Sequence, residues 1–380
     1  MTPSARPDQW QDPRRWIWPF ALTLSLVPLF IILAYPLSGQ PLLLLAPIVL
    51  GFGLVPLLDA IVGADTANPA EKEMEALSRD PFYEAVAYAL IPAHFALFIG
   101  AAWLATTQAM PWWGWVGLVA GVGLINGNLI NIGHELGHKG DRRNRLMAKA
   151  ALSLSGYGHF TIEHNQGHHV MVSTPEDCTS ARLGESVYAF GLRELPQTFA
   201  NGLRRETRRL ERKGHGFWHP ANDIVQGWAM TLAVTTVLVL WLGWAALPFI
   251  LLHHALSWIA LTATNYIEHY GLLRQQRENG RYEPCQPKHS WNANQRISNI
   301  LLLQLQRHSD HHAYPMRPYQ SLKDHADAPS LPSGYPGCLL MAAIPPLWFA
   351  VMDPRVMAWA DGRVENANLC PRAAHRYQAG

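Results

Sequence analysis

The chain has 380 residues, of which 49% are hydrophobic and 15% are charged, and its formal net charge is +2. A net charge so near zero produces no strong field, so nucleic acid is not expected as a partner. The four cysteines, Cys178, Cys285, Cys338 and Cys370, include no Cys-x-x-Cys pair. This pattern excludes a zinc ribbon or a thiolate-bound iron centre within the chain.

Apolar residues are gathered into six largely uncharged blocks, each close to the roughly 20 residues that a helix needs to cross a bilayer. The predicted spans are 16–37, 41–63, 83–106, 112–133, 226–245 and 247–268. We therefore expect an all-α integral membrane protein in which residues 1–380 form one membrane-embedded domain. Segments 134–225 and 269–360 would form a cytosolic helical portion that binds metal. A shorter apolar run at 338–352 is expected at the interface or packed against that portion.

Lysine and arginine are distributed unequally between the two sides of the predicted bundle. The side that carries Arg14 and the Arg-rich segment 204–213 is basic, whereas three short connections on the other side contain neither residue: 38–40, 107–111 and 246. Basic loops stay in the cytoplasm. The sequence therefore predicts a multi-pass membrane protein with both termini and both large loops facing the cytoplasm.

The Arg-rich stretch 195–213 predicts an amphipathic helix. Its apolar residues Leu195, Phe199, Leu203 and Leu210 recur on one face, with arginines elsewhere. One interpretation is a helix that lies on anionic lipid headgroups. The other is a docking surface for an acidic electron donor.

Histidine is abundant, at 18 residues, and eight of these residues fall into three short boxes. The boxes hold His134 and His138, then His164, His168 and His169, and finally His308, His311 and His312. Spacings of three and four place two imidazoles on one helical face, where both can reach one metal ion. A single pair occurs easily by chance on a surface, but three boxes on the same predicted side favour a metal site over ordinary histidines.

A fourth segment, 265–272, places His269 at the cytosolic end of the last predicted span. It could be an interfacial histidine between two tyrosines. We expect it to be a ligand, because a ninth imidazole would complete two nitrogen-rich metal sites. Four nearby carboxylates could accept hydrogen bonds from the ligand rings or could simply be solvated: Glu135, Glu163, Glu268 and Asp310.

The other nine histidines are not expected in the metal site. Three lie within predicted spans, where a polar side chain usually has a purpose that the sequence does not reveal: His94, His253 and His254. The remaining six are expected to be ordinary loop residues: His159, His215, His219, His289, His325 and His375.

Taken together, these segments resemble the bacterial membrane alkane 1-monooxygenase family, within the wider group of membrane desaturases and hydroxylases with three histidine boxes. The boxes alone indicate only the wider group, whereas 265–272 and 305–315 with 319–322 indicate alkane hydroxylases and their close aromatic-methyl-hydroxylating relatives. The resemblance runs over most of the chain and is strongest in four segments: 131–139, 157–190, 265–274 and 290–315.

The resemblance implies terminal hydroxylation of n-alkanes to 1-alkanols with dioxygen at a site of two iron ions. The eight box histidines match the metal boxes of the family, and His269 matches its additional ligand. The resemblance further implies that electrons come from rubredoxin, which its own reductase reduces, and that the alkane arrives from the membrane lipid. The chain lacks the cysteines of a fused rubredoxin, so this donor would be a separate protein.

Two glycines in the second predicted span, Gly51 and Gly53, have two interpretations. Small residues permit close helix packing in membranes. Alternatively, their missing side chains leave an apolar substrate channel open, with Gly51 the better candidate.

Three other functions stay open. A hydroxylase of aromatic methyl groups would share the site, and a fatty acyl desaturase or hydroxylase would need a headgroup site as well. A histidine-lined metal transporter would have histidines distributed along its spans.

Overall fold

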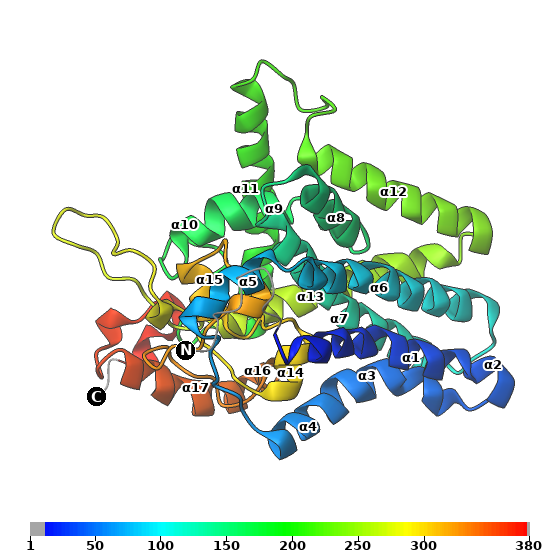
Figure 1. The fold of residues 1–380 in the computed structure, drawn as a ribbon, viewed down its shortest axis with the longest axis horizontal. Helices are drawn as coiled ribbons and strands as arrows, with labels where there is room; N and C mark the ends of the chain where they lie inside the picture. The colour runs from blue at the N-terminus through cyan, green and yellow to red at the C-terminus, as the bar shows by residue number, and fades with distance from the viewer. Residues whose placement is uncertain (1–11, 378–380) are drawn as a thin grey trace, which may run out of the picture.

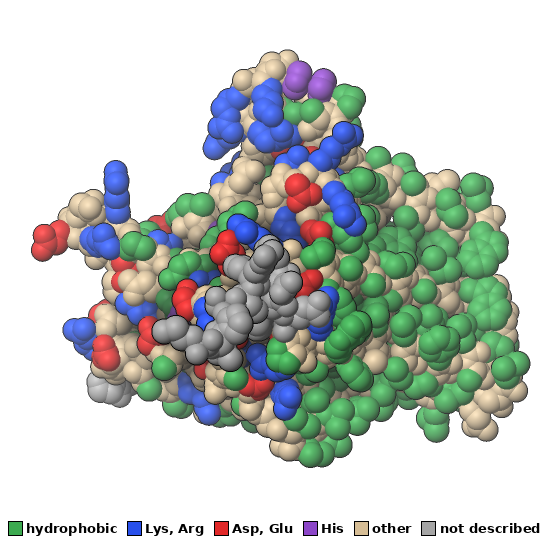
Figure 2. All heavy atoms as spheres, viewed as in Figure 1, with side chains coloured by type: hydrophobic (Ala, Val, Ile, Leu, Met, Phe, Trp, Pro, Cys, Tyr) green, Lys and Arg blue, Asp and Glu red, His purple; other side chains and the backbone are tan. Residues whose placement is uncertain are grey.

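The computed structural model describes residues 12–377, and this part of the chain is helical and contains no strand beyond isolated bridges. Six helical segments are long and apolar enough to cross a membrane: Arg15–Ser38, Pro41–Val62, Pro81–Thr107, Trp112–Gly137, Asp223–Leu242 and Ala246–His269. Each overlaps one predicted span, so the predicted all-α architecture with six spans is confirmed. The spans extend to one side of the molecule in Figure 1. Figure 2 shows hydrophobic side chains over that side and charged ones at the other end.

The first two spans are broken into short helical pieces. The first consists of η2 (Arg15–Leu22), α1 (Thr23–Leu33) and α2 (Tyr35–Ser38), and the second of η3 (Pro41–Leu45), α3 (Ala46–Val49), η4 (Leu50–Leu54) and α4 (Val55–Val62). η4 is a π-helical turn. Pro56 follows it and has no amide hydrogen to donate to Phe52, so the α-helical ladder is interrupted there.

The other four spans are continuous helices: α6 (Pro81–Thr107), α7 (Trp112–Gly137), α12 (Asp223–Leu242) and α13 (Ala246–His269). α7 and α13 approach closely because Gly123 and Gly127 face α13. A Cβ added at Gly123 would lie 2.7 Å from Cβ of Leu256, and one added at Gly127 would lie 2.6 Å from Cβ of Ala260. This contact brings together the two helix ends that carry histidine boxes.

The remaining elements lie beyond the spans. Between the second and third spans come η5 (Glu71–Glu73) and α5 (Met74–Arg79). Between the fourth and fifth come α8 (Arg142–Ser153), α9 (Phe160–Glu163), η6 (His164–His168), α10 (His169–Met171) and α11 (Val187–Glu211). After the sixth span come η7 (Pro287–His289), α14 (Arg296–Leu301), α15 (His308–Ala313), η8 (Tyr319–Ser321), α16 (Tyr335–Ala342), α17 (Pro345–Trp359), η9 (Val364–Asn366) and η10 (Pro371–Arg376).

The last apolar run forms α16 and α17, which are bent by 118° relative to each other. Trp348 of α17 packs against Tyr266 and Tyr270, with ring centroids 5.3 and 5.5 Å apart. The expected packing of this run against the histidine-bearing portion is therefore observed.

The predicted Arg-rich helix is present as α11, and its apolar residues differ in burial. Leu210 is buried, whereas Phe199 is 40% exposed, and the buried residues also include Glu194 and Glu206. The buried carboxylates keep their hydrogen bonds, because Glu194 accepts from the Thr262 hydroxyl at 2.7 Å and Glu206 from Arg209 at 2.6 Å. The inward face of α11 is therefore partly polar, and hydrogen bonds satisfy its polar groups.

The three histidines within the spans form one hydrogen-bonded chain. The side-chain oxygen of Asn126 lies 2.8 Å from Nδ1 of His94, and its nitrogen lies 2.9 Å from Nε2 of His253. His253 in turn has Nδ1 3.4 Å from Nδ1 of His254. The chain joins α6, α7 and α13, so these histidines connect neighbouring spans.

Replacing Asn126 with Leu should destabilise the bundle by about 1–2 kcal/mol, because two buried imidazoles lose their partner across helices. Thermal unfolding in detergent measures the loss. Thr236→Leu on the exposed side of α12 is the matched control and should leave the midpoint unchanged. Equal midpoints for the wild type and Asn126→Leu would contradict this role.

Candidate metal centre

The nine predicted ligand histidines gather into two adjoining sets. One set holds His134, His138, His164, His169 and His311, and the other holds His168, His269, His308 and His312. Within each set the ring nitrogens that could bind a metal lie within 4.8 Å of one another. The two sets adjoin, since the rings of His169 and His312 have centroids 4.5 Å apart. The structure therefore brings all nine predicted residues together.

Four segments contribute these histidines, and local helix geometry decides which set each one joins. Spacing of four places His134 with His138, and His308 with His312, as expected from an α-helical face. The second box behaves differently, because His164–His168 forms a π-helical turn. A wider turn aligns residues five apart, so His164 lies with His169 and His168 points into the other set.

The spacing of the ring nitrogens fits metal binding. The Nε2 atoms of His134 and His311 are 2.8 Å apart, and those of His308 and His312 are 2.9 Å apart. Neighbouring ligand nitrogens about 2.1 Å from one ion are themselves about 3 Å apart. Moreover, Nε2 of His138 and of His168 is buried without a hydrogen-bond partner among the described residues. A bound cation would satisfy these lone pairs.

Asp177 orients one of these rings and was missed in the sequence. Its Oδ2 lies 2.9 Å from Nδ1 of His168, which leaves Nε2 free to face the second set. Burial alone would raise the pKa of Asp177, but His168 and a hydrogen bond from Ser180 bring that pKa below its usual value. Asp177 follows His168 by nine residues in a loop, so no helical spacing pointed to it.

The four predicted carboxylates occupy different environments. Glu268 has Oε2 3.2 Å from Nε2 of His308, at the second set. Glu163 is buried beside Gly167, and burial, with the charge of Asp177 added, raises its pKa to about 7. Glu135 and Asp310 bond to groups other than the ligand histidines. Glu135 accepts from the Tyr319 amide. Asp310 bonds to Arg317, His325 and the Lys323 amide.

Two histidines predicted to be ordinary loop residues are buried, so that prediction is wrong for them. His289 accepts at Nδ1 from the amide of Gln286 and lies 3.0 Å from a carboxylate oxygen of Glu283. His159 packs between the rings of Tyr157 and Phe199. Neither joins the two sets. Tertiary packing that no local pattern reveals covers both rings.

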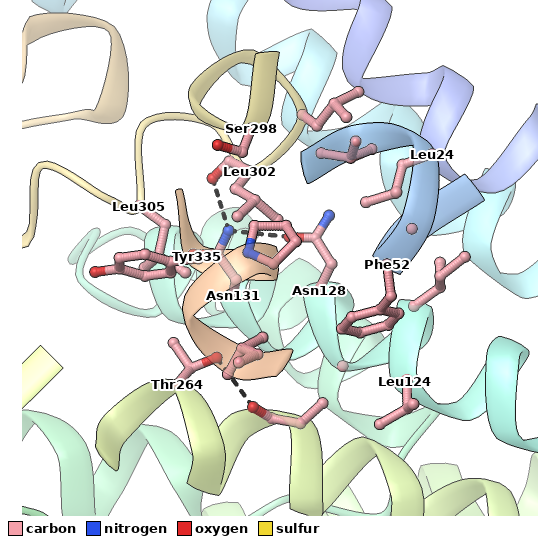
Figure 3. Close-up of a pocket in the computed structure, with 18 of the residues that line it drawn as sticks. Leu24, Phe52, Leu124, Asn128, Asn131, Thr264, Ser298, Leu302, Leu305 and Tyr335 are labelled. Atoms are coloured by element: carbon pink, nitrogen blue, oxygen red, sulfur yellow. Dashed lines mark hydrogen bonds between the residues drawn. The ribbon is translucent and has the colours of Figure 1, made fainter. Parts of the chain in front are cut away.

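An apolar cavity of about 730 Å³, including its open mouth, lies among the spans beside the histidine sets. At one end Figure 3 shows Leu24, Phe52 and Leu124. Gly51 also lines the cavity, and a Cβ there would lie 3.4 Å from the Ile125 side chain. Gly53 is not among the lining residues.

The other end of the cavity approaches the histidines. Asn131, Leu305 and Tyr335 line it there (Figure 3), and Asn131 and Leu305 each precede a box histidine by three residues, His134 and His308. Asn131 donates to the carbonyl of Leu302 at 2.9 Å, so its amide is already satisfied within the wall. Asn131 and Leu305 thus place this end of the cavity near two histidine-bearing segments, while its described lining contains no histidine.

Comparison with known proteins agrees with this arrangement. The sequence model of the fatty acid desaturase family matches residues 110–339. An alkane 1-monooxygenase of Pseudomonas putida is 46% identical over 84% of this chain and 79% of its own length, and one of Ectopseudomonas oleovorans is 43% identical over 95% and 90%. A xylene/toluene monooxygenase hydroxylase component of Pseudomonas putida is 29% identical over 60% of each chain. The chain therefore belongs to the fatty acid desaturase family and, within it, to the alkane 1-monooxygenases.

Proposed function

We propose that this enzyme hydroxylates the terminal methyl group of n-alkanes to give 1-alkanols, with dioxygen and with electrons from rubredoxin. The observation that supports this function most directly is the apolar cavity, because its lining residues Asn131 and Leu305 each lie three residues before a histidine of one of the two sets. A saturated hydrocarbon has no polar group to recognise, so a passage of apolar walls is the binding site that it requires.

We further propose that two iron ions occupy the centre. His134, His138, His164, His169 and His311 would hold one ion, and His168, His269, His308 and His312 the other. Imidazole donors suit several metals, but zinc has no redox chemistry and cannot serve an oxygenase. The irons, when bound, would supply the activation of dioxygen.

The residues of this chain then position the reactants. The walls of the cavity would bind the alkane by dispersion and exclude water, and the space left by Gly51 would set how much of the chain fits. Asp177 keeps the His168 ring in one tautomer and orientation, with Nε2 toward the second set. No side-chain nucleophile is needed, because the hydrocarbon offers no group for one to attack.

Rubredoxin with its reductase is the proposed donor, and the centre would face the cytoplasm of a bacterial inner membrane. Among the described residues, no cysteine cluster could replace such a donor. Cys178 and Cys338 are buried, Cys285 and Cys370 are partly exposed, and all four are far apart in sequence. A single membrane-embedded unit with cytosolic segments 134–225 and 269–360 is the organisation that we propose.

His138→Ala and His312→Ala remove one nitrogen from each set and should each lower alkane hydroxylation by more than about 100-fold. Metal content per protein should fall in both variants, while membrane insertion persists because the spans are unchanged. His375→Ala, at an exposed position outside both sets, is the control and should retain activity. Full activity with full metal content in either variant would sink the assignment.

Gly51→Trp should shorten the longest alkane accepted and spare shorter ones, because the indole would enter the cavity beside Ile125. The matched control is Gly53→Trp, which adds the same bulk outside the cavity lining. Products are compared across chain lengths at equal expression. An equal loss at every length would indicate damaged packing, and an unchanged profile would remove Gly51 from the channel.

The proposed orientation predicts the accessibility of introduced cysteines to a membrane-impermeant maleimide in spheroplasts. Glu278→Cys, in the exposed 275–283 loop, should react only after permeabilisation, whereas Ala109→Cys, between α6 and α7, should react in intact spheroplasts. Cys178 is too buried to report topology, and the partly exposed Cys285 and Cys370 are first replaced by Ser. The opposite labelling pattern would reverse the orientation.

A further inference from the structure

The outer face of α11 carries an arginine cradle, formed by Arg204, Arg205 and Arg208. With Asn201, these side chains line a hollow. Within residues 12–377, none of the three guanidinium groups has a carboxylate within 4 Å. A cluster of guanidinium groups without acidic partners is suited to bind carboxylates or phosphates of another molecule.

Several other basic residues differ from the arginine cradle because acids neutralise them. Arg193 pairs with Glu185, Arg209 with Glu206, Arg317 with Asp310, Lys139 with Glu84 and Lys323 with Glu71. Arg274 and Arg307 have no such pair, but both are buried and donate to backbone carbonyl groups. The cradle differs from both groups because its three arginines line one hollow together.

The cradle faces away from the membrane. The apolar side of α11 includes Leu192, which is 82% exposed, and Phe199, whose ring stacks on Trp228 of the spanning helix α12. Arg208 follows Phe199 by nine residues, or about two and a half turns, and so projects from the opposite side of the helix. Figure 2 shows basic side chains on the upper projection, mostly on its side away from the hydrophobic spans. Lipid would contact the apolar side of α11, which leaves the cradle to a soluble partner.

The cradle also touches the second histidine box. The guanidinium of Arg205 lies over Gly167, where an added Cβ would come within 3.0 Å of its Nη2, and the Glu163 carboxylate covers the same glycine. Gly167 immediately precedes His168, whose Nε2 faces the second set of ligands. Arg205, which contacts Gly167, is therefore separated from the candidate ligand His168 by this single glycine.

We propose that the arginine cradle is the docking surface of a small acidic electron-carrier protein, which delivers its electrons over the second box. This inference rests on the proposed function. Conversion of a hydrocarbon and dioxygen to an alcohol and water consumes two electrons and two protons. A one-electron carrier would therefore dock twice per turnover and lose one electron each time, and a metal held by the histidines would accept that electron.

The test reverses two exposed charges with the double variant Arg204→Glu/Arg208→Glu and leaves Arg205, beside the centre, unchanged. Alkane hydroxylation is measured against rubredoxin concentration in nanodiscs of uncharged lipid. The KM for rubredoxin should rise on the order of tenfold at low ionic strength, with kcat at saturating donor preserved. The KM of the wild type should also rise with salt, whereas that of the variant should change little.

Arg363→Glu, an exposed charge reversal after α17, is the matched control and should leave the KM for rubredoxin unchanged. An unchanged KM in the double variant would overturn the inference, as would an effect confined to nanodiscs containing anionic phosphatidylglycerol, which would assign the cradle to lipid. Binding of oxidised rubredoxin, measured without turnover, separates the two proposals. If the wild type binds rubredoxin through the cradle but makes no alkanol, the proposed function fails and the docking surface stands.

Discussion

Nine imidazoles, seven of them buried, turn their nitrogens toward two points, and this is the constraint on which the rest of the structure depends. Nε2 of His138 and of His168 has no partner among the described residues and the other inward nitrogens mainly face one another, so the arrangement is costly unless a cation binds. The close contact of α7 with α13 and the π-helical turn of the second box bring these nitrogens together. The Asp177–His168 hydrogen bond then fixes one of the rings.

The two histidine sets lie at the ends of α7 and α13, so in the proposed function unlike reactants would reach them from different sides. The apolar cavity lies among the spans, where a hydrocarbon would dissolve. The arginine cradle lies on α11, where a soluble protein would dock. On this proposal the hydrocarbon would stay in apolar surroundings while electrons would arrive over polar ones.

The sequence alone was sufficient to predict features that appear as long apolar segments or as dense clusters of one residue type. The six spans and the nine histidines were predictable because each span is a long apolar block and each box is short and dense in one residue type. The division of the histidines between two sets was not predictable, because it depends on the single π-helical turn at His164–His168. Asp177 and the buried face of α11 could not be predicted either, because Asp177 reaches His168 from an irregular loop and Glu194 of α11 bonds to Thr262 of the distant helix α13. The sequence already favoured Gly51 over Gly53 as a channel residue, and the cavity is lined by Gly51 and not by Gly53.

The π-helical turn of the second box also bears on how the sequence can change. A π turn holds one more residue than an α turn, which is equivalent to a single insertion in a regular helix. Loss of one residue between His164 and His169 would restore the α-helical register and rotate the following side chains by about 100°. The histidine content would be the same, yet the assignment of His168 and His169 to their sets would change. The number of residues between His164 and His169 is therefore as important for the metal sets as the presence of the histidines themselves.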